Sequence, residues 1–83
     1  MSKVILVTGA SSGLGEFLAN FLFEQGYVVY GTSRSIQQEG RNFKTIVMDV
    51  CNSESVNNAI KTIIAKEKKI DVVINNAGLG LAS

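Results

Sequence analysis

The chain has 83 residues, with one cysteine, no histidine and no proline, and its formal net charge is +1. A Ser-His-Asp triad, a Cys-His pair and a zinc site that needs histidine or four cysteines are therefore excluded within it. Eight basic and seven acidic residues nearly balance, so the charge predicts neither nucleic acid nor an acidic membrane as a partner.

The first half of the chain shows a strand pattern followed by a helix pattern. Residues 3–8 form a continuous, largely β-branched run, which is typical of a central parallel strand with both faces covered. After a glycine-rich turn, apolar residues recur at helical spacing and predict a helix over about residues 14–25, with Gly26 as its stop. The positions of this apolar stripe are Leu14, Phe17, Leu18, Phe21 and Leu22.

The second half repeats the alternation. Residues 27–32 and 44–48 predict two more strands, joined by eleven mostly polar residues that leave room for a turn or two of helix. Ser53 is the expected N-cap of a second helix that ends near Lys68. Its apolar stripe consists of Val56, Ala59, Ile60, Ile63 and Ile64. Residues 71–75 predict a fourth strand.

This order of elements predicts an α/β fold with right-handed crossovers between parallel strands. We expect the N-terminal part of a Rossmann-type doubly wound parallel sheet, with about four strands in the order 3-2-1-4 and two main helices. The direction of winding then reverses between the first and fourth strands and opens a crevice at their carboxyl ends. A ligand site is expected in that crevice.

The strongest local signal is the turn Thr8–Gly15, which reads T-G-A-S-S-G-L-G between the first strand and the first helix. Its glycines permit a tight turn and a close backbone approach, and the N–H groups at the helix start suit a pyrophosphate. The alternative is a glycine-rich turn that binds no ligand. The candidate binding residues of the turn are Gly9, Ser11, Ser12, Gly13, Leu14 and Gly15.

The turn resembles the fingerprint T-G-x-x-x-G-x-G of the compact short-chain dehydrogenases/reductases, and it matches every fixed position. Two further motifs of that family follow in the same order, Asp49-Val50 after the third strand and Asn75-Asn76-Ala77-Gly78 after the fourth. The resemblance implies that NAD(P) binds across the crevice, with Asp49-Val50 near the adenine. It also implies that Asn76, Ala77 and Gly78 support the central sheet and lie along the adenosine ribose.

These motif residues also have local interpretations. Asp49 could merely end a strand and begin a turn. Asn75 and Asn76 could cap exposed backbone after a strand, a role that is compatible with cofactor binding.

Cofactor preference depends on the end of the second strand, where a carboxylate would favour NAD and an arginine accommodates the 2′-phosphate of NADP. No acid stands at this junction, and the sequence there is Ser33-Arg34-Ser35. We therefore predict that Ser33 and Arg34 bind the 2′-phosphate and that NADP is preferred over NAD. The alternative is an exposed loop arginine, and Arg41 is a weaker second candidate.

The family's reaction is hydride transfer between nicotinamide and a carbonyl or alcohol, with a tyrosine of a Y-x-x-x-K motif as acid/base and a serine that polarises the substrate oxygen. Neither Tyr27 nor Tyr30 has a lysine four residues on, and the terminal Ser83 is not a credible catalytic serine. We therefore assign no catalytic residue. Residues 1–83 are expected to be the N-terminal NAD(P)-binding segment of one Rossmann domain, cut after the fourth strand, which would leave that strand on a sheet edge.

Three functions compete at this point. The first is an NADP(H)-dependent oxidoreductase of this family, represented by its cofactor-binding part and acting on an unidentified small molecule. The second is a non-catalytic dinucleotide-binding or regulatory module, and the third is a fragment that binds nothing well. The lone Cys51 and the short apolar run at the N-terminus favour a reducing, cytoplasmic setting. The longer protein is expected to be a homo-oligomer.

Overall fold

The computed structural model describes residues 2–10, 13–34 and 42–76. Its elements, in chain order, are β1 (Val4–Val7), α1 (Gly13–Glu24), β2 (Val28–Ser33), β3 (Lys44–Val47), α2 (Ser53–Glu67) and β4 (Val72–Ile74). The sequence predicted each of them to within one residue at either end. Of the predicted site residues, Ser11, Ser12, Ala77 and Gly78 lie outside the described residues, as does most of the connection between β2 and β3.

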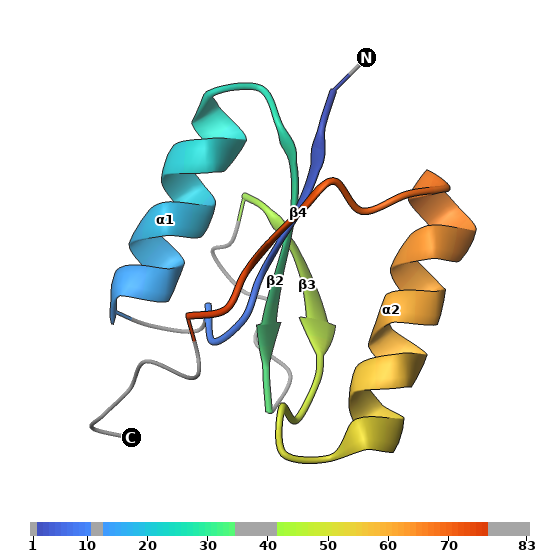
Figure 1. The fold of residues 1–83 in the computed structure, drawn as a ribbon. Coiled ribbons are helices and arrows are strands. Elements are labelled where there is room, and N and C mark those ends of the chain that lie inside the picture. Colours follow the sequence, from blue (N-terminus) through green and yellow to red (C-terminus); the bar gives the residue numbers. More distant parts are fainter. Residues whose placement is uncertain (1, 11–12, 35–41, 77–83) are drawn as a thin grey trace.

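The four strands form one parallel sheet in the order β3-β2-β1-β4, which confirms the predicted topology. β1 pairs with β2 on one side and with β4 on the other, and all four of its residues are buried. Helices α1 and α2 lie on opposite sides of the sheet (Figure 1). The uninterrupted apolar run of β1 follows from this position, because both faces of the central strand are covered.

Alternate residues of the strands supply two separate cores, one under each helix, because successive side chains of a strand point to opposite faces. The core on the α1 side consists of Ile5, Val7, Ala10, Ala19, Val29 and Phe43. The core on the α2 side consists of Val4, Leu6, Tyr30 and Ile63.

Helix α1 packs on the sheet along a narrower line than its apolar stripe predicted. Its buried residues are Gly15 and Ala19, while Leu18 and Leu22 are half-buried. Three members of the predicted stripe, Leu14, Phe17 and Phe21, are 59, 64 and 48% exposed. An apolar stripe ordinarily faces the core, but these three side chains do not. Small residues let the helix lie close to the strands, and the bulky side chains are left beside the line of contact.

The N-cap of α2 lies one residue before the predicted one. The N-cap is Asn52, whose Oδ1 accepts hydrogen bonds from the backbone N–H groups of Glu54 (3.0 Å) and Ser55 (3.2 Å). Ser53 is the first helical residue, so its prediction as the cap is wrong. Asparagine caps as well as serine, and local sequence alone did not separate the two neighbours.

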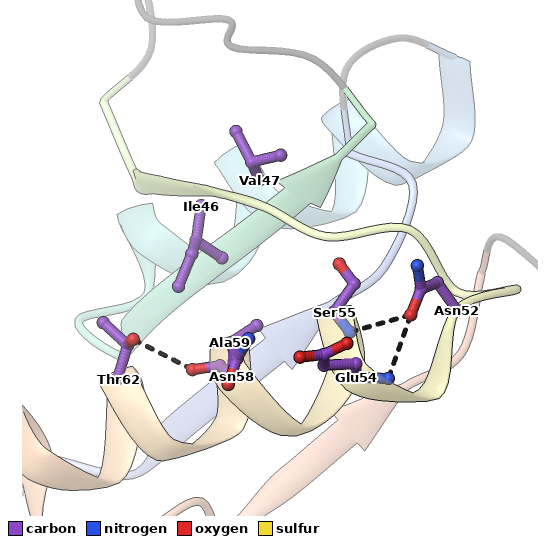
Figure 2. Close-up of a pocket in the computed structure, with 8 residues that line it drawn as sticks. All are labelled: Ile46, Val47, Asn52, Glu54, Ser55, Asn58, Ala59 and Thr62. Atoms are coloured by element: carbon purple, nitrogen blue, oxygen red, sulfur yellow. Dashed lines mark hydrogen bonds between the residues drawn. The ribbon is translucent and has the colours of Figure 1, made fainter.

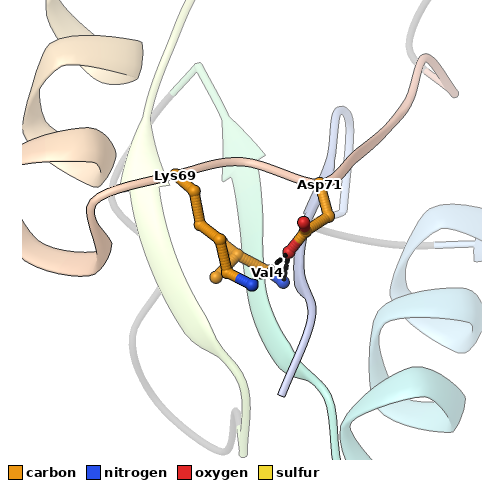
Figure 3. Close-up of polar contacts among 3 residues, drawn as sticks. All are labelled: Val4, Lys69 and Asp71. Atoms are coloured by element: carbon orange, nitrogen blue, oxygen red, sulfur yellow. Dashed lines mark hydrogen bonds and ion pairs between the residues drawn. The ribbon is translucent and has the colours of Figure 1, made fainter. Parts of the chain in front are cut away.

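The amino edge of the sheet is held by Asp71, which precedes β4. Its Oδ2 accepts the N–H of Val4 at 2.7 Å and lies 3.1 Å from the Nζ of Lys69 (Figure 3). The hydrogen bond from Val4, followed by Lys69, holds the pKa of Asp71 below its ordinary value. At the outer edge, Val72 and Val73 of β4 are exposed, as the predicted edge position requires.

The described residues contain neither a helix that could span a membrane nor a cluster of potential metal ligands. None of the helices there is long and apolar enough to cross a membrane. The same residues hold no group of three or more His, Cys, Asp or Glu side chains placed to bind a metal ion.

Candidate functional site

The predicted binding residues follow the ends of the strands. Gly9 comes after β1, Arg34 after β2, Asp49 after β3 and Asn76 after β4. Because all four strands are parallel, these four residues lie along one edge of the sheet, the carboxyl edge. The amino end of α1 opens at the same edge, directly after the turn from β1 (Figure 1).

The glycine-rich turn needs backbone conformations that other residues rarely adopt. Gly9 has φ +68° and Gly13 has φ +62°, both in the left-handed region. A Cβ atom at Gly13 would meet nothing within 4 Å, so the turn is open at that point. Leu14 follows at the exposed helix start, where backbone N–H groups lack intrahelical partners and the helix dipole is positive. This end of α1 is therefore suited to an anion.

Gly15 lets two of the sequence motifs meet. The Nδ2 of Asn76 donates to the carbonyl oxygen of Gly9 at 3.1 Å, across 67 residues of sequence. A Cβ atom on Gly15 would overlap that carbonyl oxygen and would lie 2.6 Å from the Asn76 Nδ2. The third glycine of the turn is thus required by contact with the segment after β4.

Two buried threonines hold the turn from its flanks. The hydroxyl of Thr32 accepts the N–H of Gly9 at 3.2 Å, and its backbone carbonyl accepts the N–H of Ala10 at 2.8 Å. On the other side, the hydroxyl of Thr8 donates to the Oδ1 of Asn75 at 3.2 Å. Neither threonine was among the binding residues predicted from the sequence. The available signal was a hydroxyl at the buried end of an otherwise apolar strand.

Phe43 lies next to the glycine-rich turn. A Cβ atom on Gly31 would lie 2.5 Å from the Cε1 of Phe43 and 2.7 Å from the Cβ of Ala10, so the ring and the alanine meet over this glycine. Phe43 belongs to the buried core on the α1 side. Nothing in its sequence context marked it as a neighbour of the turn.

Asp49 does begin a turn, as the local interpretation held. Its Oδ1 accepts the N–H of Cys51 at 2.9 Å, and its own N–H donates to the Ser55 hydroxyl at 2.9 Å. The carboxyl group remains partly exposed at the edge, and Val50 beside it is exposed. One carboxylate oxygen is enough for the turn, so the structural role leaves a second oxygen for another donor.

The end of β2 carries Ser33, which is half-buried, and then Arg34, which is exposed. The carbonyl oxygen of Ser33 accepts the N–H of Met48 at 2.8 Å and so continues the β2–β3 ladder to the sheet edge. The backbone that carries the Arg34 side chain is therefore held in place at the carboxyl edge.

The hydroxyl group of Tyr30 forms a hydrogen bond far from the carboxyl edge. It donates to the Oε2 of Glu67, the last residue of α2, at 2.7 Å. Burial, followed by the hydrogen bond and the negative charge of Glu67, raises the pKa of Tyr30 to about 12. A tyrosine with that pKa is a poor acid/base group near neutral pH.

Two grooves flank α2 in the described part of the molecule. The larger, about 400 Å³, lies between β3 and α2 and contains none of the predicted site residues (Figure 2). Part of its polar lining is engaged internally, since Asn52 caps the helix and the Thr62 hydroxyl donates to the backbone carbonyl of Asn58 at 2.9 Å. The smaller groove, about 220 Å³, is lined mainly by apolar side chains and includes Val50, Thr8 and Asn75. Of these two grooves, the smaller one lies next to the carboxyl edge, at Thr8, Val50 and Asn75.

Comparisons with known proteins agree with this geometry. A family model described as short chain dehydrogenase matches residues 3–83. The chain is 48% identical over 79 residues to 3-ketodihydrosphingosine reductase from Bacteroides thetaiotaomicron, covering 95% of this chain and 29% of that protein. It is 36% identical over 85 residues to the NADP-dependent 3-hydroxy acid dehydrogenase YdfG from Salmonella typhi, covering 94% of this chain and 34% of that protein.

A solved structure is similar over the same range. The ligand-free aldohexose dehydrogenase AldT from Thermoplasma acidophilum superposes with a TM-score of 0.84 at 33% identity, covering 90% of this chain and 29% of that one. The chain thus spans about a third of the length of the proteins that it matches.

Proposed function

Because the chain belongs to the short-chain dehydrogenase family, we propose that it forms the dinucleotide-binding part of an oxidoreductase that uses NADP(H). We place residues 1–83 at the N-terminal end of a longer Rossmann domain. The observation that carries the proposal is the hydrogen bond from Asn76 to Gly9 over Gly15. It joins the glycine-rich turn to the segment after β4 and so builds one continuous edge for a ligand.

In this proposal the turn binds the pyrophosphate. Gly9, Gly13, Leu14 and Gly15 let it approach the backbone N–H groups at the start of α1, where the helix dipole favours negative charge. Ser11 and Ser12 would add hydroxyl donors. The chemistry of the residues fits the group, because this edge offers N–H donors and a cation where phosphates would lie.

The adenosine end is assigned to the other strand ends. Asp49 and Val50 would contact the adenine, since a partly exposed carboxylate and an apolar side chain suit an amino group and a flat ring. Asn76, with Ala77 and Gly78, would lie along the ribose. Each of these assignments places a residue at the same carboxyl edge.

The bound nicotinamide would supply or accept the hydride. This chain's own residues bind and orient the dinucleotide, and the acid/base tyrosine and its serine are proposed to lie in the rest of the protein. A cytoplasmic location, a homo-oligomeric state and a carbonyl or alcohol substrate remain predictions for that longer protein.

We propose NADP over NAD because of Ser33 and Arg34. An exposed arginine directly after β2 can pair with a 2′-phosphate through charge-assisted hydrogen bonds, and no acid precedes it to bind a 2′-hydroxyl instead. The relative from Salmonella typhi carries NADP-dependence in its name, which supports the same preference.

The test is Arg34→Ala in the full-length protein, with NADPH and NADH titrated separately. We expect NADPH affinity to fall by more than about 1.5 kcal/mol, the scale of a hydrogen bond to a charged group, while NADH affinity barely changes. Lys61→Ala removes an exposed cation from the middle of α2 and should change neither affinity. Equal losses for both dinucleotides would refute the assignment of Arg34, and a wild-type protein that binds neither would refute the proposed function.

A further inference from the structure

Thr32 is among the most deeply buried polar side chains of the described residues, with 1% of its surface exposed. It makes two contacts with the glycine-rich turn through consecutive N–H groups. Its hydroxyl oxygen accepts from Gly9 and its carbonyl oxygen accepts from Ala10. We infer that Thr32 is a positioning residue that fixes the turn for the pyrophosphate, an inference that rests on the proposed function.

The turn requires such an anchor because glycine has little conformational preference of its own. Both polar backbone atoms of Gly9 are taken by neighbouring segments, the N–H by Thr32 and the carbonyl oxygen by Asn76. Gly9 is therefore held from β2 on one side and from the end of β4 on the other. The helix start that would bind the anion follows it within a few residues.

The carbonyl contact is made by the backbone, so any residue at position 32 would provide it. The hydroxyl contact depends on the side chain. Valine has the branched shape of threonine but cannot accept a hydrogen bond, so Thr32→Val leaves the Gly9 N–H without its partner. The turn then loses its attachment to β2 at the residue that must hold φ +68°.

This role predicts a binding pattern that differs from that of Arg34. The pyrophosphate is common to NADPH and NADH, so a displaced turn weakens both by the same factor. Loss of a contact to the 2′-phosphate weakens NADPH alone. The ratio of the two affinities therefore separates the turn from the arginine.

The experiment compares wild type, Thr32→Val, Thr32→Ser and Tyr30→Phe in the full-length protein by fluorescence titration with NADPH and NADH and by thermal unfolding. We expect Thr32→Val to bind each dinucleotide about tenfold more weakly, with the NADPH to NADH ratio unchanged. Thr32→Ser keeps the acceptor and should bind like wild type, even though the lost methyl group lowers its melting temperature.

Tyr30→Phe is the matched control. It removes a buried hydroxyl from the same strand, two residues away and on the same face, but that hydroxyl bonds Glu67 at the end of α2. We expect it to lower the melting temperature without weakening either dinucleotide.

Three results would overturn the inference. Thr32→Val could bind both dinucleotides like wild type, it could lose affinity for NADPH alone, or Thr32→Ser could be as weak as Thr32→Val. The last would mean that the site needs the shape of the side chain rather than its oxygen. A wild-type protein that binds neither dinucleotide refutes the proposed function and this inference together, whereas the other results refute the inference alone.

Discussion

Gly15 shows how closely the backbone is packed at the candidate site. Its missing side chain leaves room for the Gly9 carbonyl and the Asn76 amide to form their hydrogen bond. Neither neighbour can move away easily, because one is backbone and the other is held by that bond. The glycine is therefore required by space at this residue and not by its own backbone angle.

We predict that Gly15→Ala breaks the bond between Asn76 and Gly9. The new Cβ would overlap the carbonyl oxygen, and crowding of this kind costs about 1 to 3 kcal/mol of unfolding free energy. NADPH affinity should fall as well, since the turn is displaced. Urea unfolding and NADPH titration of the full-length protein would measure the two effects.

Gly26→Ala is a suitable control for this variant. A Cβ there would meet nothing within 4 Å, but φ of +97° strains any residue with a side chain. Gly26 lies in the turn after α1, at the amino edge, away from the candidate site. It should lose stability and keep wild-type affinity, and a comparable loss of affinity would contradict the local explanation for Gly15.

The two helices differ in how well their sequence periodicity predicted which side chains face the sheet. Helix α2 buries Ala59 and Ile63 of its predicted apolar stripe, whereas Ile64 of the same stripe is 43% exposed. The apolar stripe of α1 includes Leu14, Phe17 and Phe21, which are exposed, so its periodicity alone did not identify the residues that face the sheet. The side of α1 that faces the sheet is the side with Gly15 and Ala19, because these small residues allow the helix to approach the strands closely.

The cap of α2 is the testable feature at this scale. Asn52→Ala removes the side chain that accepts from Glu54 and Ser55, and should lower the free energy of unfolding by about 1 kcal/mol. Ser53→Ala changes an exposed residue in the first turn and should have almost no effect. Chemical denaturation of both variants decides between the two positions, and a larger loss for Ser53→Ala would contradict the assigned cap.

For the whole molecule, Asp71 links the first and last described strands at the amino edge. Its pKa is lower in the folded chain than the ordinary value of 3.8, so the unfolded chain binds the proton more readily. The stabilisation is therefore complete above that ordinary value and is lost as pH falls below it, through the folded pKa.

We predict that Asp71→Asn flattens this part of the stability profile. Wild type should lose free energy of unfolding as pH falls below about 4, and the variant should lose less over the same range. Lys69→Met should keep part of the wild-type slope, because the hydrogen bond from Val4, the largest single cause of the shift, remains. Denaturation series at several acid pH values would test both, and equal slopes for wild type and Asp71→Asn would refute the role of this carboxylate.

In the described part of the chain, large apolar side chains are exposed on both α1 and β4. On α1 they include Leu14, Phe17 and Phe21, and the rings of Phe17 and Phe21 stack with centroids 6.5 Å apart. On β4 they are Val72 and Val73. Both groups agree with the proposal that these residues are part of a larger domain.

The sequence by itself determined the order of the elements, the parallel sheet with β1 at its centre and the glycine-rich turn at the carboxyl edge. These features follow from periodicity, from glycine placement and from the right-handed rule for crossovers, all of which are local or topological. Only the tertiary structure decided that Thr32 and Asn76 both hydrogen-bond Gly9 and that Phe43 lies over Gly31. It also decided that α1 leaves Leu14, Phe17 and Phe21 exposed. Those contacts join residues far apart in the chain, so they depend on strand register and on how closely the backbones approach. A pattern along one segment does not contain that information.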